Sequence, residues 1–170
     1  MLRTGSETGS ETRVYDTVRS LYRRNSENDS PGCRSYLSAV RGKIEVGATY
    51  QSQTRVEEWM TAAKAGNKGV DVLSTPMLLQ LVEEAAMQCI APALAPDEIT
   101  LATHVDLTHL SATAVGLIVR TEVEVLKFDG KRIEYAFTAF DEREKIAEGT
   151  HERYVTSREK FRERLEEKLG

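Results

Sequence analysis

The stretch that decides the fold is residues 74–92, STPMLLQLVEEAAMQCIAP. A hydroxyl residue followed by proline is typical of a helix start, with Thr75 at the cap and Pro76 at the first helical position, where a missing N–H costs nothing. Apolar residues then recur at helical spacing, namely Met77, Leu78, Leu81, Val82, Ala85, Ala86, Cys89 and Ile90. The pattern predicts a helix that begins at Thr75, ends before Pro92 and is apolar on most sides.

One carboxylate of this helix lies in apolar surroundings. The neighbours of Glu83 at helical spacing are Leu79, Ala86, Met87 and Ile90, whereas Glu84 lies between Gln80 and Gln88. An ionised carboxylate in an apolar setting costs several kcal/mol unless it is protonated or paired. Glu83 is therefore expected to be the more buried of the two and is the candidate functional carboxylate.

The segment after the helix supplies a candidate partner. Between residues 99 and 107, odd-numbered residues are mostly apolar and alternate with polar ones, which is typical of a half-buried strand with its odd-numbered side facing inward. His109 continues the inward series, so we expect it to face the helix and to pair with Glu83. His104 and Asp106 face outward, and two ligands without a third predict no metal site.

The remaining elements can be read from alternation and turn signals. Residues 46–56, 117–125, 133–139 and 145–156 predict strands, with a tight turn at Asp129-Gly130. Residues 62–69 predict a flexible loop that could act as a lid. Thr156 and Glu159 form a capping box for a short last helix that carries Phe161, Leu165 and Leu169. The order predicts an α+β domain in which an antiparallel sheet wraps the long helix.

Composition sets the outer limits. The chain has 170 residues, 40% hydrophobic and 29% charged, which suits one domain at residues 42–170 after a low-complexity, disordered tail at residues 1–41. A net charge of −4 argues against nucleic-acid or anionic-membrane partners. No apolar run approaches the roughly 18 residues that cross a bilayer. Cys33 and Cys89 lie in unlike settings, which predicts no disulfide and a cytoplasmic location.

Several motifs together resemble a known family. The spacing of Thr75, Glu83 and His109, the segment HLSATAVG at 109–116 and the segment GTHER at 149–153 are similar to the fluoroacetyl-CoA thioesterase branch of hotdog thioesterases. The resemblance covers roughly residues 43–166. It implies a hotdog fold, a homodimer or dimer of dimers, an acyl-CoA substrate and no cofactor.

The resemblance also implies site residues. The family's catalytic Thr, Glu and His fall on Thr75, Glu83 and His109. Its substrate-contacting arginine falls on Arg153, and its substrate-contacting glycine falls on Ala102.

The departures from the family pattern bear on specificity. Family members resemble His-x-x-x-Thr-Pro-x-Gly after the histidine, whereas this chain has Thr113-Ala114-Val115-Gly116. Aromatic residues gate the fluoroacetyl-specific enzyme just before its threonine, but residues 61–74 contain none, and Gly69 stands where a phenylalanine would contact the substrate. We therefore expect hydrolysis of short acyl-CoA thioesters without fluoroacetyl specificity.

The chemistry follows from the residue types. A carbonyl at the helix start would meet free N–H groups, and His109, oriented by Glu83, would act as general base on Thr75 or on water. The sequence leaves the attacking group open between Thr75, Glu83 and water. Each residue also has an ordinary structural interpretation: a cap, an ion pair or a core histidine.

Other interpretations of the chain stay open as well. His151 and Arg153 share a strand face that could hold CoA phosphates, support a dimer or form a solvated edge. A non-catalytic acyl-CoA-binding protein and a hydratase or dehydratase remain alternative functions. The chain contains no Asp-x-Asn-Pro-x-His-like segment of the kind that a hydratase would carry.

Overall fold

The computed structural model describes residues 43–170, so the tail predicted for residues 1–41 lies outside the described residues. The elements follow in the order β1 Thr49–Arg55, η1 Glu58–Met60, α2 Thr75–Ile90, η2 Ala91–Ala93, β2 Glu98–His109, β3 Ile118–Phe128, β4 Arg132–Phe140, β5 Lys145–Ser157 and α3 Arg158–Leu169. This order confirms the prediction of one strand, one long helix, four strands and a short last helix.

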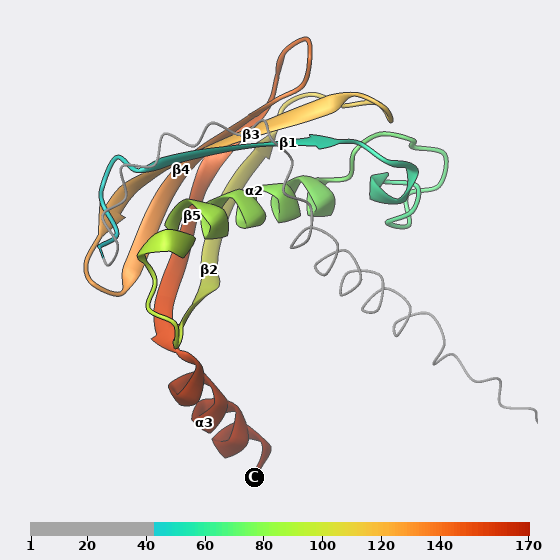
Figure 1. Cartoon of the computed structure of the whole chain (residues 1–170). Coiled ribbons are helices and arrows are strands. Elements are labelled where there is room, and N and C mark those ends of the chain that lie inside the picture. Colours follow the sequence, from blue (N-terminus) through green and yellow to red (C-terminus); the bar gives the residue numbers. More distant parts are fainter. Residues whose placement is uncertain (1–42) are drawn as a thin grey trace, which may run out of the picture. The chain divides into compact units, whose positions relative to one another are not determined.

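The five strands form one antiparallel sheet. Their spatial order is β1-β3-β4-β5-β2, and every neighbouring pair is antiparallel. Figure 1 shows the sheet curving around α2, which lies along the concave face. The predicted wrapping of a sheet around the helix is therefore confirmed. β2 lies at one edge of the sheet, and its outer side has no strand partner among the described residues.

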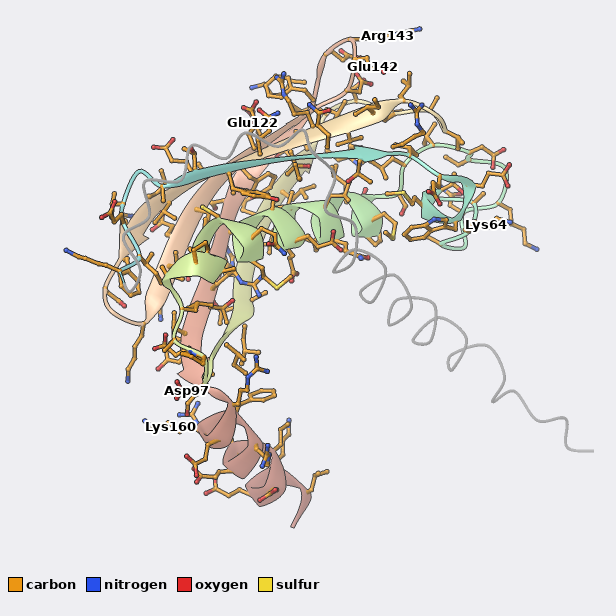
Figure 2. The ribbon with its side chains drawn as sticks, in the orientation of Figure 1. Lys64, Asp97, Glu122, Glu142, Arg143 and Lys160 are labelled. Carbon is orange, nitrogen blue, oxygen red and sulfur yellow. The ribbon has the colours of Figure 1, made fainter. Side chains whose placement is uncertain are left out.

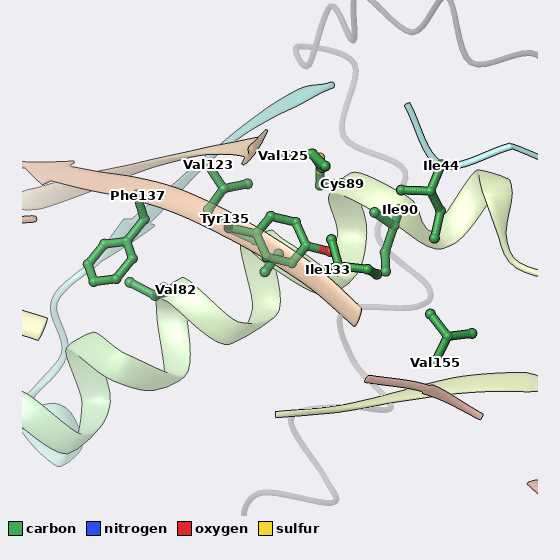
Figure 3. Close-up of a cluster of buried hydrophobic side chains, with 12 residues drawn as sticks. Ile44, Val82, Cys89, Ile90, Val123, Val125, Ile133, Tyr135, Phe137 and Val155 are labelled. Carbon is green, nitrogen blue, oxygen red and sulfur yellow. The ribbon is translucent and has the colours of Figure 1, made fainter. Parts of the chain in front are cut away.

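The core forms between α2 and the concave face of the sheet. Seven helix residues are buried, namely Leu78, Leu81, Val82, Ala85, Ala86, Cys89 and Ile90. Figure 3 shows Tyr135 and Phe137 of β4 lying close to Val82 and Ile90 of α2. Fully burying one large apolar side chain contributes about 1.5–3 kcal/mol, so this contact surface is the main source of stability.

A β-bulge changes the inward face of β2. Thr100 pairs with Val155 and Ala102 pairs with Arg153, but the register shifts between Ala102 and His104. Beyond the shift, Val105 pairs with His151 and His109 pairs with Ala147. Directly opposed residues share one face of an antiparallel pair, and the β5 partners Val155, Arg153, His151 and Ala147 are all buried.

The helix-facing series of β2 is therefore even-numbered before the bulge and odd-numbered after it. The predicted odd series is wrong for Ile99 and Leu101 and right from Val105 to His109. The physical reason is the extra residue of the bulge, Thr103, which rotates the strand by one position. As a result, Ala102 and His109 both lie on the helix side.

The convex face of the sheet and the loops carry the charges. Figure 2 shows that Lys64, Glu122, Arg143 and Lys160 project outward from the ribbon. Ion pairs such as Lys127–Glu134, at 2.7 Å, link neighbouring strands on this exposed surface, and such pairs contribute about 0–1 kcal/mol each. Among residues 43–170, no helix is both long and apolar enough to cross a membrane.

Gly149 of β5 occupies a position where no side chain fits. It lies between β2 and β4, and a Cβ there would overlap the main-chain oxygen of Asp106 and approach the Phe137 ring to 2.8 Å. We expect Gly149→Ala to destabilise the protein by about 3 kcal/mol, because the strands must move apart. Urea unfolding followed by circular dichroism measures this loss. Thr150→Ala, at the next position, is the control and should cost about 1 kcal/mol or less. Equal effects of the two changes would show that the sheet has room at Gly149.

Candidate active site

The start of α2 carries two hydroxyl residues with different tasks. Ser74 is the N-cap, and its hydroxyl accepts a hydrogen bond from the Met77 N–H at 3.4 Å. Thr75 is the first residue inside the helix, so the expectation that Thr75 itself is the cap is wrong by one position. Because Ser74 performs the capping, the Thr75 hydroxyl is free to bind elsewhere.

The Thr75 hydroxyl binds His109. Its Oγ1 lies 2.9 Å from His109 Nδ1, which joins the start of α2 to the end of β2. Thr75 is exposed, while His109 is half-buried, and its Nε2 has no hydrogen-bond partner among the described residues. A hydroxyl and an imidazole at this distance form the arrangement in which a histidine takes a proton from an attacking oxygen.

The main chain beside this pair offers a donor. The N–H groups of Met77 and Leu78 both donate to Ser74, and Pro76 has no N–H. Within the described part of the chain, the N–H of Thr75 is thus the donor of the first turn left without a partner. It lies at the positive end of the helix dipole, where a developing negative charge is stabilised.

Glu83 is placed with a different partner. Its Oε2 lies 3.4 Å from Arg153 Nη1, and the Glu83 side chain is 34% exposed. Thr75 and Glu83 are eight positions apart in the helix, which is about 12 Å along the axis. The expected pairing of Glu83 with His109 is therefore not made within one chain, since the two residues belong to clusters two turns of α2 apart.

Arg153 is fixed inside the protein. Its side chain is 3% exposed, its Nε donates to Thr100 Oγ1 at 3.0 Å, and its Nη2 donates to the Thr100 carbonyl at 3.1 Å. The interpretation of this strand face as a solvated edge is wrong, because the bulge in β2 turns Thr100 toward the arginine. The guanidinium is occupied by protein acceptors, which favours a role beside Glu83 over binding of CoA phosphates.

His151 lies behind Arg153 and is fully buried. Its Nε2 is 3.1 Å from Arg153 Nη1, its Nδ1 is 3.2 Å from the His104 carbonyl, and its ring stacks on Tyr135 with centroids 6.0 Å apart. Burial, together with the charge of Arg153, lowers the pKa of His151 below its usual 6.5. The imidazole is therefore neutral near neutral pH.

The other two expected substrate residues lie on the surface. Ala102 is exposed on β2, opposite Arg153 in the strand register. Gly69 is exposed and has a φ of 83°, in a segment whose ends are held by the bridges Thr61–Leu73 and Val72–Ala114. The structure thus places Ala102 with the Glu83–Arg153 cluster and Gly69 in a surface turn that precedes α2.

Two residues of the site, Ser74 and Thr100, are not evident from the sequence. Ser74 and Thr75 are adjacent hydroxyl residues and equally good caps by type, so the sequence does not distinguish them. Regular alternation predicts that Thr100 faces outward, because the sequence of the strand carries no mark of a bulge. Only the pairing of β2 with β5 shows that Thr100 lies beside Arg153.

A family model described as a fluoroacetyl-CoA-specific thioesterase matches residues 56–159 of the chain. The chain belongs to this family. The fluoroacetyl-CoA thioesterase of Streptantibioticus cattleyicolor is 36% identical to it over 98 residues, which is 58% of this chain and 70% of that relative.

Solved structures agree with the assignment to this family. A threonine-to-serine variant of the fluoroacetyl-CoA thioesterase FlK in complex with acetyl-CoA has a TM-score of 0.71 and 28% identity, covering 75% of this chain and all of the other. A hot-dog-like protein from Thermanaerovibrio acidaminovorans has a TM-score of 0.69 at 22% identity, covering 74% of this chain and 93% of that one, which shows the fold alone. The predicted α+β hotdog class is confirmed.

The division of tasks between Ser74 and Thr75 can be tested by stability. We expect Ser74→Ala to lower the free energy of unfolding by about 1 kcal/mol, because the Met77 N–H loses its acceptor. Thr75→Ala should cost clearly less, since the cap remains. Urea titration of both variants checks this. A larger loss of unfolding free energy for Thr75→Ala than for Ser74→Ala would show that Thr75 is the cap.

Proposed function

We propose that this protein is an acyl-CoA thioesterase that hydrolyses short-chain acyl thioesters. The observation that carries the proposal is the 2.9 Å hydrogen bond between Thr75 Oγ1 and His109 Nδ1 at the free N-terminus of α2. Membership of the thioesterase family supports it, and so does the acetyl-CoA bound to the FlK variant. The absence of aromatic residues from 61–74 favours acyl groups other than fluoroacetyl.

The groups at the helix start suit each step of the reaction. The oxygen of the thioester carbonyl accepts a hydrogen bond from the Thr75 N–H. His109 accepts the proton of the attacking oxygen, which belongs to Thr75 or to a water at the same place. A C–O bond forms and the C–S bond breaks. The imidazolium then returns its proton to the departing CoA thiolate. Where Thr75 attacks, a water that loses its proton to His109 then adds to the acyl-threonine ester, and the ester C–O bond breaks as His109 returns the proton to Thr75 Oγ1; where water attacks, the first step already completes hydrolysis. Both routes yield the free acid and CoA.

Glu83 enters this site from a second copy of the chain in our proposal. Within one chain it lies about 12 Å along α2 from Thr75, yet its carboxylate is held by Arg153 and remains one-third exposed. The free edge of β2, a strand of 12 residues, offers the surface for a homodimer. A two-fold axis there would lay two α2 helices antiparallel on one continuous sheet. Glu83 of the partner subunit would then face the Thr75–His109 pair.

We further propose that the protein acts in the cytoplasm, with no nucleic-acid or membrane partner. The negative net charge supports the lack of a nucleic-acid or anionic-membrane partner. The free thiol of Cys89 supports the location in a reducing compartment. Burial raises the pKa of the Cys89 thiol to about 11, so this thiol stays protonated and takes no part in the chemistry.

Steady-state release of free thiol from acetyl-, propionyl-, butyryl- and fluoroacetyl-CoA tests the proposed activity. His109→Ala and Glu83→Gln should each lower kcat by about 10²-fold, the usual scale for losing a general base or its partner. Thr75→Ser should keep much of the activity, because the hydroxyl remains. Glu84→Gln is the matched control and should act like the parent protein. If His109→Ala and Glu83→Gln fold normally and turn over at the parent rate, the proposed chemistry is wrong.

Hybrid dimers test whether the site is shared between subunits. We expect mixed dimers of Glu83→Gln and His109→Ala chains, prepared by co-expression with two affinity tags, to regain about half of the parent activity. The reason is that one of the two shared sites then holds both native residues. Light scattering gives the mass of each species. If all catalytic residues came from one chain, the hybrid would be as inactive as the Glu83→Gln and His109→Ala homodimers.

A further inference from the structure

The hydrogen bonds of His151 select one tautomer. Arg153 Nη1 is always a donor, so the contact at 3.1 Å requires His151 Nε2 to be an acceptor. The ring proton must then lie on Nδ1, where it donates to the His104 carbonyl at 3.2 Å. Only the neutral, Nδ1-protonated ring satisfies both contacts. An imidazolium would place a second cation against Arg153 and lose the acceptor.

The groups around the ring agree with this state. Arg153 faces it from its own strand, Tyr135 stacks on it from β4, and Glu83 acts on it from α2 at longer range. Burial raises the pKa of Tyr135, so its phenol also stays neutral. Among residues 43–170, the charges that act on the neutral ring are thus those of Arg153 and, beyond it, Glu83.

The ring completes the set of acceptors that orient Arg153. The two contacts to Thr100 hold one side of the guanidinium, while Nη1 is shared between His151 Nε2 and Glu83 Oε2. The contact to Glu83, at 3.4 Å, is the longest of these. Without His151, the guanidinium would keep only Thr100 and the long contact to Glu83, so its Nη1 side could swing and Glu83 would lose a fixed partner.

We propose that His151 is a positioning residue for thioester hydrolysis. Its ring, neutral and protonated on Nδ1, accepts a hydrogen bond from Arg153 and so holds the guanidinium in the orientation that fixes the Glu83 carboxylate. This inference rests on the proposed function. It assigns no contact between His151 and the substrate, since the ring is fully buried.

A structural measurement tests, without reference to activity, whether His151 holds Arg153 in place, an arrangement that we call the clamp. Two-bond ¹H–¹⁵N spectra of the histidine-labelled full-length protein near neutral pH should show His151 with its proton on Nδ1. The Nε–H and Nη–H signals of Arg153 should exchange slowly in the parent protein and in His151→Gln, whose amide can accept from the arginine and donate to the His104 carbonyl. In His151→Leu these signals should exchange much faster. A ring protonated on Nε2, or on both nitrogens, would overturn the proposal.

Kinetics then test whether the clamp acts through Glu83. His151→Leu should lower kcat about tenfold with little change in KM, and His151→Gln should retain most of the activity. In a Glu83→Gln background, His151→Leu should cause no further loss, because the carboxylate that it positions is already gone. Val155→Ala, a buried change on the same strand face, is the control for general destabilisation and should lower the melting temperature but not kcat.

The outcomes separate the two proposals. An equal fold-loss from His151→Leu in both backgrounds would assign His151 a merely structural role and overturn the inference. If the parent protein releases no thiol from any acyl-CoA, the proposed function fails, and the tautomer and arginine-exchange measurements still decide whether the clamp exists.

Discussion

The structure depends on the need to cover a helix that is apolar on most of its circumference. α2 buries residues that point in several directions, so a flat sheet could cover only part of its surface. One antiparallel sheet curves around it, and β4, the central strand, and its neighbour β3 carry most of the packed apolar side chains of the sheet. The chain thereby places the helix start next to the end of β2. The proposed chemistry needs that juxtaposition.

The same burial sorts the polar groups into two clusters. At the first turn of α2, a capped and exposed helix end brings together Thr75, His109 and a free N–H. Two turns later, Glu83 meets an arginine that is enclosed by Thr100 and His151. Buried charge is tolerated only when it is paired and hydrogen-bonded, which explains why Arg153 has several acceptors. The separation of these clusters in one chain favours a site that two chains complete.

The bulge in β2 connects the two clusters. Without the extra residue at Thr103, one inward series would run the length of the strand, and Ala102 and His109 would lie on opposite faces. With the bulge, Thr100 and Ala102 face Arg153 while His109 faces Thr75. A local irregularity that disrupts the strand pattern therefore lets one edge strand serve both clusters, as is common for bulges near functional sites.

The sequence by itself determined the element order, the hotdog class and the identity of Thr75, Glu83 and His109 as residues of interest, because periodicity and helix-start chemistry are local properties. The expected contrast between Glu83 and Glu84 is not observed, because both are half-buried and Glu84 accepts a hydrogen bond from Gln80. The position of the cap, the face of Thr100 and the partner of Glu83 were decided only by the tertiary structure. A cap depends on which of two adjacent hydroxyl residues has the extended backbone, a bulge depends on strand pairing, and an ion pair depends on distances between elements 70 residues apart in the chain. No local pattern of residues encodes these three.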